Sequence, residues 1–99
     1  MTINKTTNGT AMTIAVEGRL ETTTAPELEA VIKSEIDGIT ELTFDLSSLE
    51  YISSAGLRVL LSAQKTANKQ GCSMKVIGAN EIVKEVFEIT GFSDILTIE

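Results

Sequence analysis

The chain of 99 residues contains no histidine, no tryptophan and a single cysteine, Cys72. Without histidine the commonest general base is missing, and Cys72 has neither a Cys–His catalytic partner nor a second good zinc ligand. No phosphate-binding loop and no Gly-x-Ser-x-Gly elbow is present. One cysteine cannot form an internal disulfide, which fits a reducing, cytoplasmic location. These absences predict a protein that is not an enzyme and that has no metal or other cofactor.

Long apolar runs and excess basic charge are also missing. No apolar run approaches the roughly 18 residues that would indicate a membrane-spanning helix, and residues 1–5 lack the apolar core of a signal peptide. The net charge is −6, from 8 basic and 14 acidic residues. This balance weighs against nucleic acid and against anionic membranes as partners. It favours a protein partner with a basic patch, although acidity also serves solubility alone.

What the chain does contain predicts one α/β domain over residues 1–99. Its 42% of apolar residues can form a core at this length. Alternating apolar residues predict strands, and helical spacing predicts three helices. The strands are expected at 3–7, 12–16, 41–46, 74–77 and 95–98. The helices are expected between Thr24 and Gly38, from about Ser54 to Gln70, and between Asn80 and Gly91.

Local signals join these elements. Asn8-Gly9 predicts a two-residue hairpin turn, and Thr24 with Glu27 predicts a capping box that opens the first helix. The order β-β-α-β-α-β-α-β implies right-handed crossovers between parallel strands. We therefore expect a single-domain mixed β-sheet with an antiparallel edge and with helices packed against it.

The stretch 45–61 passes from a strand to a helix through a polar loop that ends in Ser53 and Ser54. A serine at a helix start either caps the helix or stands where a phosphate is well placed. Gly56 in the first helical turn indicates either close approach of a partner or its nucleotide, or tight packing on the sheet. Ala55 and Leu57 suit an interface, and Leu57 suits the core equally well.

This stretch resembles the signature of STAS domains, through Asp45-Leu46-Ser47, Ile52–Leu57 and Leu60. Within that family it is most similar to the stand-alone bacterial anti-sigma factor antagonists. Val16–Leu20 followed by Thr24–Pro26 extends the resemblance over nearly the whole chain. Two positions depart from the usual motif: Ser53 stands where many members have Asp, and Ala55 stands where many have Ser or Thr.

The resemblance implies the same mixed-sheet fold and a regulatory switch. The unphosphorylated form would bind an anti-sigma factor that is also a serine kinase, and would thereby release a sigma factor. With the resemblance, Ser54 is expected both to cap the second helix and to present a hydroxyl for phosphorylation. Phosphorylation of Ser54, or less favourably of the adjacent Ser53, would end that binding, and a serine phosphatase would reset the protein. The expected binding surface comprises Asp45, Ser53, Ser54, Ala55, Gly56, Leu57, Arg58, Thr22, Thr23 and Thr24.

Simpler roles stay open for several of these residues. Asp45 suits capping of the turn through its own side chain, Arg58 suits a solvated surface position, and residues 22–24 suit a helix cap with a loop. The alternative function is a constitutive scaffold or accessory subunit, as in a stressosome-like or lipid-transport complex, without a phosphoswitch. For the regulatory function we expect a monomer or weak dimer.

Overall fold

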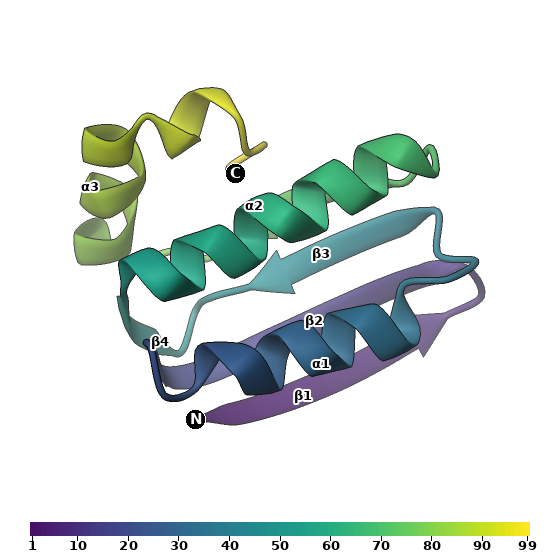
Figure 1. The fold of residues 1–99 in the computed structure, drawn as a ribbon, viewed down its shortest axis with the longest axis horizontal. Coiled ribbons are helices and arrows are strands. Elements are labelled where there is room, and N and C mark those ends of the chain that lie inside the picture. The colour runs from purple at the N-terminus through teal and green to yellow at the C-terminus, as the bar shows by residue number, and fades with distance from the viewer.

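The computed structural model describes residues 1–99 and contains five strands and three α-helices (Figure 1). The elements are β1 (Thr2–Asn8), β2 (Ala11–Leu20), α1 (Ala25–Glu35), β3 (Glu41–Asp45), β4 (Leu49–Ile52), α2 (Ser54–Lys69), β5 (Ser73–Ile77) and α3 (Glu81–Thr90), followed by the 3-10 turn η1 (Phe92–Asp94). Helices α1 and α2 lie side by side against one face of the sheet, and α3 packs on β4 at its end.

The sheet confirms the expected mixed topology. Its strand order is β1-β2-β3-β5, with β4 paired to β2. β1 runs antiparallel to β2, and the pairs β2–β3, β3–β5 and β2–β4 are parallel. The carboxyl ends of β2, β3 and β4 therefore point the same way, and the loops that follow them are gathered at one end of the molecule.

β4 is a strand that the sequence pattern did not predict. β3 pairs with the first half of β2, and after a turn at residues 46–48 the chain pairs again with the second half of β2. In β4 only the first and last residues are buried, so the two-residue alternation is absent. The pairing of β4 with β2 is also irregular, since its register shifts between Gly18 and Arg19. At such an irregularity the two-residue alternation of buried and exposed side chains is lost.

The opening hairpin is confirmed, but its turn is one residue later than predicted. Asn8 pairs with Ala11, so the two-residue loop is Gly9-Thr10 rather than Asn8-Gly9. Gly9 has a φ of +64°, and no residue other than glycine has a positive φ. A glycine with positive φ at the first loop position is typical of a type II′ turn, whereas type I′ needs positive φ at both.

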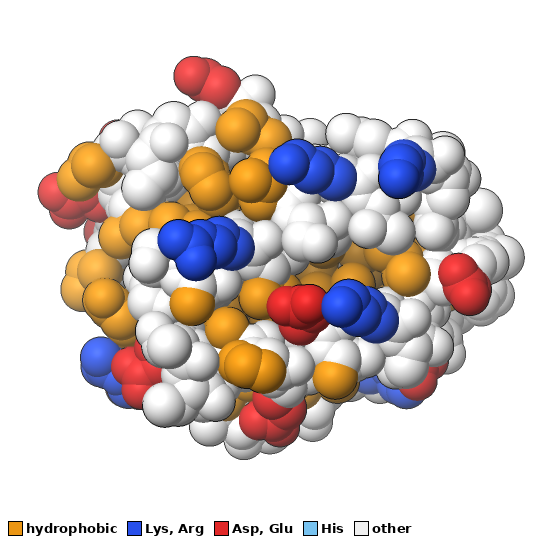
Figure 2. Space-filling model, viewed as in Figure 1, with side chains coloured by type: hydrophobic (Ala, Val, Ile, Leu, Met, Phe, Trp, Pro, Cys, Tyr) orange, Lys and Arg blue, Asp and Glu red, His pale blue; other side chains and the backbone are white.

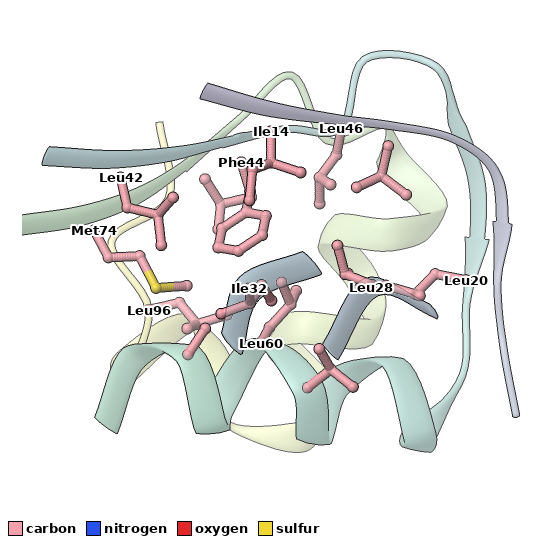
Figure 3. Packing of buried hydrophobic residues seen from close by; sticks show 14 of the residues in the cluster. Ile14, Leu20, Leu28, Ile32, Leu42, Phe44, Leu46, Leu60, Met74 and Leu96 are labelled. Carbon is pink, nitrogen blue, oxygen red and sulfur yellow. The ribbon is translucent and has the colours of Figure 1, made fainter. Parts of the chain in front are cut away.

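The expected last strand at 95–98 is wrong. The N–H groups of Ile95 and Leu96 both bond to the carbonyl of Phe92, which continues the turn of η1. The segment meets the sheet only through a single parallel bridge between Ile98 and Val76, in which the Val76 N–H donates to the Thr97 carbonyl and the Glu99 N–H donates to the Val76 carbonyl. Figure 3 shows why the turn is favourable, since it places the buried Leu96 side chain within the core between α2 and the sheet.

The core is one cluster of 26 buried residues between the sheet and the helices (Figure 3). Ile14 and Phe44 from the sheet meet Leu28 and Leu60 from α1 and α2, and all four are fully buried. Burial of such side chains supplies most of the favourable free energy of folding. The core thus fixes α2, and with it the start of that helix, against the ends of β2 and β4.

Candidate partner-binding site

Asp45 shapes the turn between β3 and β4. Its Oδ1 accepts a hydrogen bond from the Ser47 hydroxyl at 2.6 Å and another from the Ser47 backbone N–H at 3.0 Å. These two bonds stabilise the carboxylate and lower the pKa of Asp45, the hydroxyl contributing more than the backbone N–H. The turn-capping role of Asp45 is therefore confirmed.

Ser53, not Ser54, caps α2. Its backbone is extended, its N–H donates to the Leu20 carbonyl at 2.8 Å, and its carbonyl accepts from the Leu57 N–H. Its Oγ accepts from the N–H of Gly56 at 3.4 Å. The expectation that Ser54 both caps and presents a hydroxyl is wrong in its first part, because the cap must precede the first helical residue. Ser54 is that first residue, and its side chain is exposed.

Gly56 packs tightly on the sheet. It is buried, and a Cβ added to it would lie 2.7 Å from Leu20 Cγ and 2.9 Å from Ile52 Cγ1. Of its two interpretations, tight packing is the one that the structure supports. Leu57 is 4% exposed and belongs to the core, whereas Ala55 is only partly buried. Gly56 and Leu57 thus hold the site in place, while their neighbours reach its surface.

Arg58 follows Ser54 by four residues, so the two share one side of α2. Its side chain is exposed and takes part in none of the four ion pairs of the structure. α2 contains no acidic residue. The helix turn beside Ser54 therefore carries a basic side chain and no acidic one, although the whole chain carries a charge of −6.

The loop at residues 22–24 lies next to the start of α2. Leu20 ends the strand before that loop, Ser53 directly precedes α2, and the Ser53 N–H donates to the Leu20 carbonyl. Thr22 and Thr23 are exposed. The predicted capping box is wrong, since the Thr24 hydroxyl points back and accepts from the Glu21 N–H at 2.9 Å. The same hydroxyl donates to the Arg19 carbonyl. Thr24 therefore closes the loop rather than capping α1.

Two surface features at this end of the molecule were missed. The Arg19 guanidinium lies over the Tyr51 ring, 4.7 Å from its centroid, and Tyr51 is 37% exposed. On α3, the side chains of Ile82 and Ile89 are exposed. Nothing in the sequence pairs Arg19 with Tyr51. The exposed residues of α3 could have been predicted, because this helix has more apolar residues than a single buried stripe can accommodate.

The rest of the molecule contains one sizeable cavity and no cluster of metal-ligating side chains. No three Cys, Asp or Glu side chains gather as metal ligands would, and none of the helices is long and apolar enough to cross a membrane. A half-open cavity of about 570 Å³ lies at the opposite end of the strands, beside Glu41 and Ser73. It contains none of the residues expected at the binding surface.

Comparisons with known proteins identify the family and the fold. A family model described as the STAS domain matches residues 2–99. An anti-sigma-B factor antagonist of Staphylococcus aureus is 28% identical over 99 residues, which covers 99% of this chain and 92% of that protein. The crystal structure of an anti-sigma factor antagonist from Mycobacterium paratuberculosis superimposes with a TM-score of 0.89 at 23% identity, covering 98% of this chain and 83% of that one.

A further fold neighbour is the Bacillus cell fate determinant SpoIIAA, solved in its phosphorylated form. It matches with a TM-score of 0.79 at 14% identity, covering 99% of this chain and 91% of that one. The strand order, the capped start of α2 and the match of the family model over nearly every residue lead to one assignment. The chain belongs to the STAS domain family.

Proposed function

We propose that this protein is an anti-sigma factor antagonist that is switched by phosphorylation of Ser54. In its unmodified form it binds an anti-sigma factor with serine kinase activity and so releases a sigma factor. The observation that carries the proposal is the exposed Ser54 at the first position of α2, whose hydroxyl is not used to cap the helix. The Staphylococcus aureus relative, an anti-sigma-B factor antagonist by name, supports the partner class.

Ser54 is a better phosphorylation site than Ser53. The Ser53 hydroxyl already accepts a hydrogen bond from the helix, and its side chain is half-buried. Modification of Ser53 would exchange a helix cap for a bulky charge, at a cost of about 1 kcal/mol for the cap alone. Ser54 is exposed and carries no such structural bond, so a kinase can reach it without disturbing the fold.

The switch then acts on the partner rather than on the fold. A phosphate adds a charge of about −1.5 to −2, which is favourable at a helix N-terminus. In a packed interface the same charge would lose its water without gaining a partner. Burial of an uncompensated charge costs several kcal/mol, which is enough to lower affinity by orders of magnitude. Removal of the phosphate by a serine phosphatase would restore binding.

The test is a titration of the purified chain against an anti-sigma kinase from the same genome. We expect Ser54→Asp to weaken binding at least tenfold, which corresponds to about 1.4 kcal/mol. Ser54→Ala should bind like the wild type and incorporate no phosphate. Ser53→Ala is the matched control, and it should still be phosphorylated. Equal binding by all variants without phosphate incorporation would instead support a constitutive scaffold or accessory subunit.

A further inference from the structure

An exposed apolar stripe lies on α3. It consists of Ile82, Val86 and Ile89, which repeat at the spacing of one helix face. Ile82 is 60% and Ile89 76% exposed, while Val83 and Phe87 on the other side of the helix are fully buried. Figure 2 shows hydrophobic side chains gathered over α3 and around the beginning of α2. Such clusters on a soluble domain mark interaction surfaces.

The start of α3 is fixed to β4, the strand that leads into Ser54. Asn80 caps α3 through its Oδ1, and its Nδ2 donates to the carbonyl of Leu49 at 3.0 Å, which ties the helix start to β4. From Leu49 the strand leads to Ser54 in five residues, or at most about 17 Å at about 3.3 Å per residue. A standard interface covers about 800 Å² per partner, so a footprint centred near Ser54 can extend to Leu49, where the start of α3 is held.

Charge distinguishes between the possible occupants. α3 carries Glu81, Glu85 and Glu88 against the single Lys84. A second copy docked face to face would bring these carboxylates together, and an anionic membrane would repel them. Arg58, by contrast, is an exposed cation without an ion pair on the neighbouring helix. The surface therefore fits a different protein that offers an apolar patch and a carboxylate.

We propose that the α3 stripe is the second part of the surface that binds the anti-sigma partner, an inference that rests on the proposed function. The partner places apolar side chains on Ile82 and Ile89 and a carboxylate opposite Arg58. Arginine is among the residue types that contribute most to interface affinity, and apolar side chains form the dry centre of an interface. The glutamates at the edge set orientation. Phosphorylation at Ser54 would then act at one margin of a wider contact.

The test uses the full chain and the same titration. The double variant Ile82→Ser with Ile89→Ser should weaken binding at least tenfold, and the matched Ile82→Leu with Ile89→Leu should stay within twofold of the wild type. Arg58→Gln should also weaken binding, whereas Lys69→Gln at the far end of α2 should not. Because Ile82 and Ile89 are exposed, thermal melts should show that the serine variant stays folded.

The outcomes separate this inference from the proposed function. Wild-type affinity of the double serine variant, together with loss of binding by Ser54→Asp, would overturn the inference and leave the phosphoswitch standing. Loss of binding by the serine variant but not by Ser54→Asp would keep the surface and reject the switch. If sedimentation shows that the serine variant converts a dimer to a monomer, the stripe joins two copies and the inference is wrong.

Discussion

At the scale of single residues, Gly56 determines how closely α2 approaches the sheet. A methyl group at this position would lie 2.7 Å from Leu20 Cγ. We expect Gly56→Ala to destabilise the protein by about 1–3 kcal/mol, because overpacking outweighs the roughly 1 kcal/mol that alanine gains in helix propensity. For a domain of this size the melting temperature should fall by about 4 °C or more. Thr66→Ala, exposed on the same helix, is the control, and an unchanged melting temperature for Gly56→Ala would contradict the packing argument.

Asp45 makes the stability depend on pH. Its folded-state pKa is lowered by the hydrogen bonds from Ser47, so its contribution is fully present above the unfolded value of about 3.9. That contribution is lost as the pH falls through the lower folded value. We expect Asp45→Asn to be less stable than the wild type in urea at pH 7, with the gap narrowing near pH 3. A gap of equal size at both pH values would show that the carboxylate charge is not involved.

The motif residues show which details a sequence can determine. The strand end at Asp45 and the helix start at Ser53 and Ser54 could be located from local spacing, because both are visible in the order of residue types. The division of roles between Ser53 and Ser54 could not, since it depends on the bond from the Ser53 N–H to Leu20, more than 30 residues away. Gly56 was ambiguous for the same reason, because its neighbours come from β2 and β4.

At the scale of elements, one side chain joins α3 to β4 by hydrogen bonds, in addition to the packing of α3 in the core. Asn80 caps α3 with its oxygen and holds the Leu49 carbonyl with its nitrogen. We expect Asn80→Ala to cost about 2 kcal/mol, because it removes both a helix cap and the hydrogen bond to the Leu49 carbonyl. Amide exchange in α3 should accelerate. Asn80→Asp keeps only the cap, so its free energy of unfolding should lie between those of the wild type and Asn80→Ala. If Asn80→Asp costs as much as Asn80→Ala, the whole effect belongs to the bond with Leu49.

The elements that were predicted well are those with a long and regular period. α2 spans Ser54–Lys69 against the expected 54–70, and β5 lies where its alternation placed it. β2 begins where expected but continues past the predicted end at residue 16 to Leu20, because its second half pairs with β4. β4 and the C-terminal segment were missed because both depend on distant partners. β4 exists through its pairing with β2, and the expected strand 95–98 gives way to a turn that buries Leu96.

At the scale of the whole molecule, we expect phosphorylation of Ser54 to change the charge without changing the fold. The charge would go from −6 to about −7.5 to −8. The added phosphate would lie at a helix N-terminus that has Arg58 one turn away and no acidic residue in its first turn. The melting temperature of the phosphoprotein should equal or exceed that of the unmodified chain.

Nuclear magnetic resonance would check this prediction directly. Shift changes should be confined to the start of α2 and the adjacent loop at residues 22–24. Ser54→Ala treated with the same kinase serves as the control. Changes spread over the sheet, or a clearly lower melting temperature, would mean that the phosphate disturbs the fold, and the switch would then be conformational rather than a matter of surface charge.

The packing of Gly56 also constrains the order in which substitutions can accumulate during evolution. Any side chain at this position meets Leu20 on one strand and Ile52 on another, so a single replacement would be selected against at once. A lineage could give up the glycine only after both neighbours had become smaller, and each of those earlier steps would leave a cavity in the core. The glycine, Leu20 and Ile52 should therefore vary together or not at all among descendants of this gene.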